Sequence, residues 1–152
     1  MELWRISNHR SLSGMGGIRY SARWHSAGQR IVYLAESPAG AMIEVLVHLE
    51  LEEDELPPHY TLLRVEVPAH MAIQKLVPPR GAAWMTNEAV TRKLGDAWLA
   101  AQSSALACVP SAILPRTSNY LLNPAHPEAA RIKVKDATKH NFDVRLLRSI
   151  RG

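Results

Sequence analysis

Two ionisable side chains interrupt an otherwise apolar stretch between Ala41 and Leu49. Glu44 and His48 are four residues apart, so on a helix they project from the same face, one turn from each other. Three roles suit this pair: a carboxylate that stabilises positive charge during a reaction, a structural ion pair, or a metal site. Spacing alone favours a structural role, with His48 or Arg23 as the partner of Glu44.

The helix that would carry Glu44 has clear start signals. Ser37 can cap it, and Pro38 suits its first position because the missing N–H costs nothing there. The following residues are apolar on nearly every side, so we expect the helix to be buried. A buried carboxylate needs partners, and the surrounding elements must supply them.

Short strands and helices alternate in the rest of the chain. Helices are expected to begin near Asn87 and near Pro127. The first of these would turn Val90, Leu94, Ala97, Trp98 and Ala101 toward the core. Strands are expected at residues 3–7, 17–24, 31–35, 60–67, 105–109, 120–122 and 142–147. The order predicts one compact α+β domain with a mixed sheet over residues 1–152.

Composition narrows the class of protein. The chain has 152 residues, 47% of them hydrophobic, and one cysteine, Cys108, which excludes an internal disulfide and favours an intracellular, cytoplasmic protein. No segment approaches the roughly eighteen consecutive apolar residues of a membrane span. The net charge of +4 is spread along the chain, which favours a phosphate-bearing small molecule or an acidic protein partner over direct nucleic-acid binding.

A glycine-rich segment, residues 13–17, leaves two readings open. Its glycines could let backbone amides approach a phosphate, or they could form a plain flexible turn. The segment lacks the spacing and the Lys-Ser/Thr ending of a P-loop, which favours the turn.

Several short strings follow one another in the order seen in the RES-domain toxins of bacterial toxin–antitoxin pairs, and the chain resembles that family over nearly its whole length. The strings are Leu3–Ile6, Arg23–Trp24, Val32–Ser37, Ala41 with Glu44, Val109–Ser111 and Asn119–Pro127. One position departs from the pattern: many members have asparagine after the Arg-Trp pair, where this chain has His25. The departure puts in doubt any polar contact inferred for that position.

The resemblance assigns roles to particular residues. It places the family's arginine on Arg23, its tyrosine on Tyr33, its glutamate on Glu44 and its serine on Ser111, with Arg5 as a second arginine. It implies a fold like the ADP-ribosyltransferases of the diphtheria-toxin type, with NAD⁺ as substrate and no cofactor. The implied partner is a cognate antitoxin with an Xre-like helix-turn-helix domain, through which alone the toxin would meet DNA. A toxin homodimer is also consistent with the family.

The chemistry of NAD⁺ suits this set. Nicotinamide leaves ribose as a neutral molecule from a cationic pyridinium, so no general acid is required and one carboxylate can suffice. Glu44 would stabilise the positive ribose, and its loss would reduce the rate on the order of 10²–10³-fold. Tyr33 would stack beside the nicotinamide, and Arg23, helped by Arg5, would hold pyrophosphate or ribose oxygens.

Further roles and alternatives remain open. Ser111 and Asn119 are expected to bind the substrate, and Ser111 is not expected to be a nucleophile. Trp84 is expected in the core, with a cover over the nicotinamide as the alternative. The seven histidines form no tight cluster in the sequence, so we expect no metal. The acceptor could be water, phosphate or a protein side chain. A non-catalytic binding module and a purely structural Glu44 are the competing hypotheses.

Overall fold

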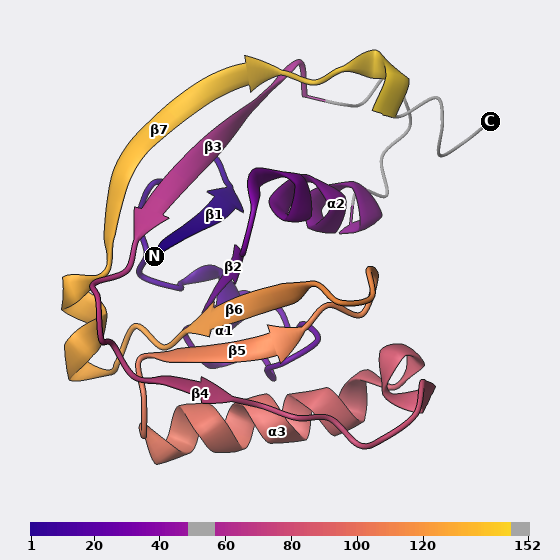
Figure 1. The fold of residues 1–152 in the computed structure, drawn as a ribbon, viewed down its shortest axis with the longest axis vertical. Helices are drawn as coiled ribbons and strands as arrows, with labels where there is room; N and C mark the ends of the chain where they lie inside the picture. The colour runs from indigo at the N-terminus through magenta and orange to yellow at the C-terminus, as the bar shows by residue number, and fades with distance from the viewer. Residues whose placement is uncertain (49–56, 147–152) are drawn as a thin grey trace.

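A mixed β-sheet forms the framework of the chain in the computed structural model, which describes residues 1–48 and 57–146. Within these residues the sheet has seven strands, in the order β4-β5-β6-β2-β1-β3-β7 (Figure 1). Only β4 and β5 pair in parallel; the other neighbours are antiparallel. The bounds are β1 Glu2–Ile6, β2 Val32–Ala35, β3 His59–Glu66, β4 Ile73–Lys75, β5 Leu106–Pro110, β6 Ser118–Leu122 and β7 Lys133–Asn141. The prediction of a single mixed α+β domain is confirmed.

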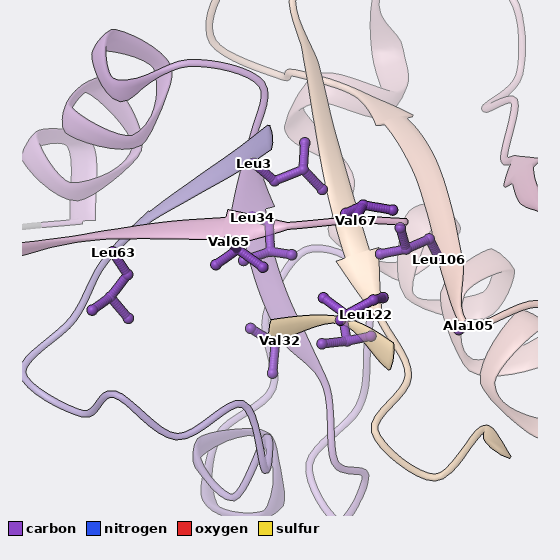
Figure 2. Packing of buried hydrophobic residues seen from close by; sticks show 10 residues of the cluster. Leu3, Val32, Leu34, Leu63, Val65, Val67, Ala105, Leu106 and Leu122 are labelled. Carbon is purple, nitrogen blue, oxygen red and sulfur yellow. The ribbon is translucent and has the colours of Figure 1, made fainter. Parts of the chain in front are cut away.

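The two faces of the sheet carry separate hydrophobic cores, because successive side chains of a strand point to opposite faces. In β2, Val32 and Leu34 belong to one core, whereas Tyr33 packs at the edge of the other. Figure 2 shows the first core, which consists of Leu3, Val32, Leu34, Leu63, Val65, Val67, Ala105, Leu106, Leu122 and Ile132. The second consists of Trp24, Ile31, Leu76, Trp84, Trp98, Leu99, Ala107, Val109 and Leu121.

Helix α2, Pro38–His48, begins where the sequence predicts. The backbone N–H of Gly40 donates to Oγ of Ser37 at 3.0 Å, which is the expected cap. The helix contacts β1 and β2 along one side only (Figure 1). The expectation of a buried helix is therefore wrong: Ala41 and Leu46 are buried, whereas Val47 is 55% exposed. Glu44 lies at the border between the two sides, where ligand and protein can both reach it.

Helix α3, Glu88–Ala101, holds the backbone of the segment that precedes β2. The Thr91 hydroxyl donates to the carbonyl of Arg23 at 2.5 Å, and Nε of Arg92 donates to the carbonyl of Ala22 at 2.8 Å. The Asp96 carboxylate accepts from the backbone N–H and the hydroxyl of Ser26, at 2.9 and 2.6 Å. Side chains of α3 thus bind the backbone of residues 22–26 to the helix, and we call this segment the strap.

This strap explains two wrong predictions. Residues 17–24 do not form a strand; they contain the short helix α1, Gly16–Arg19, and an isolated bridge between Ala22 and His25. Their backbone groups bind α3 instead of a neighbouring strand. The buried face of α3 differs accordingly, because the strap needs small or polar neighbours. It consists of Thr91, Gly95, Trp98 and Leu99. Of the five predicted core positions Val90, Leu94, Ala97, Trp98 and Ala101, Trp98 is buried and Leu94 packs against the second core, whereas the other three do not belong to it.

Of the remaining predicted elements, most are confirmed and one is misplaced. The strands near residues 3, 31, 60, 105 and 120 are confirmed, and a 3-10 helix, η3 Pro127–Arg131, begins at the predicted proline. The last strand is misplaced, because β7 ends at Asn141 and residues 144–146 are helical. The backbone N–H of Arg145 donates to Oδ1 of Asp143 at 2.9 Å, a side-chain contact that favours a turn over a strand. Residue 147 lies outside the described residues.

Gly95 lies directly against the backbone of the strap, and its replacement tests the contact. A Cβ at this position would lie 1.6 Å from the carbonyl oxygen of Trp24, so Gly95→Ala must push two backbones apart. We expect it to lower the free energy of unfolding by about 2 kcal/mol or more, measured by urea unfolding.

Gly16→Ala is the matched control, since nothing lies within 4 Å of its Cβ. Its stability should equal that of the wild type or exceed it by up to about 1 kcal/mol. Equal stability of the two alanine variants would contradict the strap as a close backbone contact.

Candidate active site

A cavity of about 600 Å³ lies between α2 and the segment 21–24, over β1, β2 and β6. Five of the six side chains that the sequence singles out line it: Arg5, Arg23, Tyr33, Glu44 and Asn119. They come from positions far apart in the sequence, so the fold brings them together. The sixth, Ser111, is buried behind Glu44.

Two hydrogen bonds hold one oxygen of the Glu44 carboxylate. Oε1 accepts from Nδ2 of Asn119 at 2.8 Å and from the hydroxyl of Ser111 at 3.2 Å. The other oxygen, Oε2, has only Nε2 of His48 nearby, at 3.9 Å, among the described residues. The Glu44 side chain is 30% exposed. One oxygen is therefore fixed by the protein while the carboxylate faces the cavity.

The hydroxyl of Ser111 is fully used within the protein. It accepts the backbone N–H groups of Ile113 and Leu114, at 3.1 and 3.2 Å, and donates its only proton to Glu44. The backbone N–H of Ser111 donates in turn to the carbonyl of Thr117 at 2.8 Å. This turn between β5 and β6 thus fixes a donor against Glu44, and Ser111 can act on a ligand only through that carboxylate.

Tyr33 directs its hydroxyl into the protein. Its oxygen lies 3.1 Å from the backbone nitrogen of Trp24, which donates to it, and 2.8 Å from Nδ1 of His25. Burial raises the pKa of Tyr33 above its ordinary value of 10.0, so the phenol stays protonated at neutral pH. The half-buried ring of Tyr33 therefore lines the cavity, whereas its hydroxyl points away from it.

Arg23 is oriented by the region around the start of α3. Its Nη1 donates to the carbonyl of Trp84 at 3.3 Å, and its Nη2 lies 3.9 Å from Oε1 of Glu88. Glu88 is itself paired with Arg92 at 2.5 Å. Trp84, in the 3-10 helix η2 Ala83–Thr86, is buried with its ring 6.4 Å from that of Trp24, so it belongs to the core.

Arg5 brings a second positive charge to the cavity. Burial lowers the pKa of its guanidinium, which nevertheless stays protonated at neutral pH, since arginine is effectively always charged in proteins. Its Nη1 donates to the carbonyl of Ser11 at 3.5 Å. None of the ion pairs found in residues 1–48 and 57–146 involves Arg5. Its charge is therefore available to an anionic ligand.

The glycine-rich segment packs tightly and does not line the cavity. Gly14 has a φ of +73°, and a Cβ there would lie 2.7 Å from the nitrogen of Ile31. A Cβ on Gly17 would lie 2.4 Å from the carbonyl oxygen of Gln29. Gly14 and Gly17 thus allow close backbone contacts, which explains these two glycines without a phosphate. In the same described part of the chain, no group of three His, Cys, Asp or Glu side chains could hold a metal ion.

Two contributors to the site were missed from the sequence. Glu88 lines the cavity and pairs with Arg23, and its only local signal is the spacing to Arg92, one helical turn later. His25 is buried and contacts Tyr33, although its difference from the family pattern had made any polar contact there doubtful. Glu88 acts across a long sequence separation, which local patterns do not report, whereas His25 contacts residues only eight positions away that no regular helix or strand spacing links to it.

A comparison with known protein families identifies the family of the chain. The family model described as "RES domain" matches residues 2–145. The chain belongs to the RES domain family. The sequence-based recognition is thereby confirmed, and Arg23, Tyr33, Glu44 and Ser111 meet around or behind one cavity of this RES domain.

Relatives resemble this RES domain over nearly their full length. A protein named "Toxin Res" from Pseudomonas putida is 49% identical over 140 residues, which cover 91% of this chain and 96% of the relative. A protein named "Prs ADP-ribosylating toxin" from Sphingobium sp. is 36% identical over 156 residues, which cover 95% of this chain and 96% of the relative. The RES domain is thus closely related to proteins named as toxins.

A solved structure supports the fold. The crystal structure of the M. tuberculosis MbcT–MbcA toxin–antitoxin complex contains a chain that superposes with a TM-score of 0.72 at 18% identity, covering 99% of this chain and 88% of that one. This likeness establishes a shared fold. In the described residues, no helix is long and apolar enough to cross a membrane.

The raised pKa of Tyr33 predicts a loss of stability at alkaline pH. Above pH 10 the unfolded state ionises this phenol, whereas the folded state keeps it neutral, so stability falls as the pH rises through and beyond that value. Tyr33→Phe should therefore reduce the decline in unfolding free energy between pH about 8 and about 11, measured by urea unfolding.

Tyr20→Phe provides the control for this experiment, because Tyr20 is 74% exposed. Its stability should follow the wild-type dependence on pH. If Tyr33→Phe follows that dependence as well, the phenol is not held neutral by its surroundings.

Proposed function

We propose that this chain is the toxin of a toxin–antitoxin pair and that it cleaves the bond between nicotinamide and ribose in NAD⁺. The observation that carries the proposal is the Glu44 carboxylate, held on one oxygen by Asn119 and Ser111 and facing a cavity lined by two arginines. A carboxylate that served only to stabilise the fold would not need to border an open cavity.

Glu44 suits the electrostatic demand of this reaction. As nicotinamide departs, positive charge develops on the ribose, and a fixed carboxylate stabilises that charge without having to reorganise. The bonds from Asn119 and Ser111 set the direction of the carboxylate before the substrate arrives. Because the leaving group needs no proton, the site requires no second carboxyl group as an acid.

The other cavity residues suit the rest of NAD⁺. Arg5 and Arg23 can hold the pyrophosphate, for which the planar guanidinium is well shaped. The ring of Tyr33 can stack on the nicotinamide, since its hydroxyl is occupied elsewhere. A volume of about 600 Å³ is in the range of ligand pockets.

The acceptor distinguishes the candidate reactions. With water the protein is an NAD⁺ glycohydrolase, and with inorganic phosphate it is a phosphorylase. Transfer of ADP-ribose to a protein is the second candidate, which the name of the Sphingobium relative favours. A fold of the diphtheria-toxin ADP-ribosyltransferase type would suit either outcome.

The partner would be an antitoxin. The fold is shared with a chain of a toxin–antitoxin complex, which supports a protein partner for this domain as well. We infer an antitoxin with an Xre-like helix-turn-helix domain, which would also carry the contact with DNA; the toxin could form a homodimer in that assembly.

One turnover experiment tests the proposal. Purified protein is incubated with NAD⁺, with and without phosphate and with a protein acceptor, and the ADP-ribose product is identified by mass spectrometry. Glu44→Gln should lower the rate on the order of 10²–10³-fold, because it removes the charge but keeps the shape.

Glu66→Gln is the control, since this exposed carboxylate on β3 pairs with Lys135 and does not line the cavity. It should leave turnover unchanged. NAD⁺ that stays intact with the wild-type protein under every condition would leave a non-catalytic binding module as the remaining interpretation.

The two donors to Glu44 should affect turnover more than substrate affinity. Asn119→Ala and Ser111→Ala should each lower kcat by roughly ten- to hundredfold, since each removes a hydrogen bond to a charged group. Their effects should be less than additive, because both bonds orient the same oxygen, Oε1. Steady-state kinetics of the two single variants and the double variant provide the measurement, with melting temperatures to confirm folding.

A further inference from the structure

A continuous chain of hydrogen bonds leads from the glycine-rich segment to the cavity. Nε2 of His25 lies 3.1 Å from the carbonyl oxygen of Gly17, and Nδ1 of His25 lies 2.8 Å from the hydroxyl of Tyr33. The backbone N–H of Trp24 donates to the same hydroxyl at 3.1 Å. Tyr33 and Trp24 line the cavity, whereas His25 lies behind them and is 2% exposed.

The chemistry of the groups sets the direction of each bond. A carbonyl oxygen can only accept, so Nε2 of His25 carries a proton and donates to Gly17. In a neutral imidazole the other nitrogen then accepts, so the hydroxyl of Tyr33 donates to Nδ1. The Tyr33 oxygen is left to accept from Trp24, as the distance indicates. Every donor and acceptor in the chain is thereby matched.

The glycine at position 17 makes this arrangement possible. A Cβ there would lie 3.1 Å from Nε2 of His25 and 2.4 Å from the carbonyl oxygen of Gln29. A side chain at position 17 would therefore crowd the imidazole and displace the backbone near Gln29, and the glycine avoids both contacts. The close packing of the glycine-rich segment thus positions His25, which in turn contacts Tyr33 at the cavity.

We propose that His25 is a positioning residue that fixes the ring of Tyr33 for the nicotinamide, with Gly17 as the anchor of His25. The inference rests on the proposed function, in which that ring stacks on the leaving group. A tyrosine on a strand is held at its Cα, but rotation about the Cα–Cβ bond can still swing its ring to another position. The two hydrogen bonds at the phenolic oxygen, from Trp24 and to His25, hold the far end of the ring in place against that rotation.

Two substitutions separate the halves of the imidazole. In His25→Asn, an amide oxygen attached at Cγ takes the place of Nδ1 and can accept from Tyr33, but nothing reaches Gly17. In His25→Gln, the amide nitrogen reaches the place of Nε2 and can donate to Gly17, but the acceptor for Tyr33 is lost. The first variant keeps the bond to the ring, and the second keeps the bond to the anchor.

We expect the two variants to rank in opposite order for activity and for stability. His25→Asn should keep kcat/KM for NAD⁺ within about threefold of the wild type, even where its melting temperature falls. His25→Gln should lose roughly ten- to hundredfold in kcat/KM, chiefly through KM, while melting closer to the wild type. Tyr33→Phe combined with His25→Gln should lose no more than Tyr33→Phe alone, because the loss of the hydroxyl already removes the bond to His25.

His70→Asn is the control for the chemical change, since His70 is exposed, lies outside the cavity and has a φ of 65° that asparagine tolerates. It should match the wild type in both measurements. The proposal is overturned if activity simply follows melting temperature, or if His25→Gln retains more activity than His25→Asn.

A second readout keeps this inference separate from the proposed function. The rotamer of Tyr33 about its Cα–Cβ bond, measured by NMR from the three-bond couplings to its Cβ protons on protein labelled at tyrosine, should be averaged in His25→Gln and stay single in His25→Asn, whatever reaction the protein catalyses. Intact NAD⁺ with the wild type, together with this pattern of couplings, would reject the NAD⁺ chemistry alone. Unchanged couplings in both variants would reject the positioning role even if NAD⁺ is cleaved.

Discussion

The hydrogen bond from Asn119 to Glu44 is the contact on which the cavity depends. It joins α2 to β6, and the neighbouring bond from Ser111 joins α2 to the turn between β5 and β6. A half-buried carboxylate loses hydration, and donors from the protein must compensate for that loss. Here both donors reach the same oxygen, which leaves the other without a hydrogen bond from the described residues. The compensation thus also creates an oriented negative charge at the cavity.

The opposite wall depends on backbone contacts with α3. Thr91, Arg92 and Asp96 bind main-chain groups of residues 22–26, so the position of this segment follows from the helix more than from its own sequence. Arg23 extends from the strap toward Glu88. The backbone N–H of Trp24 and the imidazole of His25 both hydrogen-bond the hydroxyl of Tyr33. A scaffold of this kind places polar side chains with little freedom, which favours preorganised electrostatics over induced closure.

Sequence reasoning found most of the framework and most of the cavity. Alternating apolar residues located β3, short apolar stretches located β1, β2, β5 and β6, and the Ser37-Pro38 pair located the start of α2. The family resemblance selected side chains that meet around one cavity, because a site shared within a family requires the same residue types. The failures have one physical origin: residues 17–24 have strand-like composition, but their backbone partners are side chains of α3, nearly seventy residues later in the chain. Local patterns carry no information about such partners, and for that reason the pairing of Glu88 with Arg23 was also missed.

The place of β6 in the middle of the sheet has a consequence for how the protein comes into being. It lies between β5 and β2, and it carries the asparagine that holds Glu44. A nascent chain that has emerged only as far as α3 already contains Arg5, Arg23, Tyr33 and Glu44, yet it lacks the strand that joins the two halves of the sheet. The cavity around this carboxylate can therefore be completed only after translation has passed Asn119.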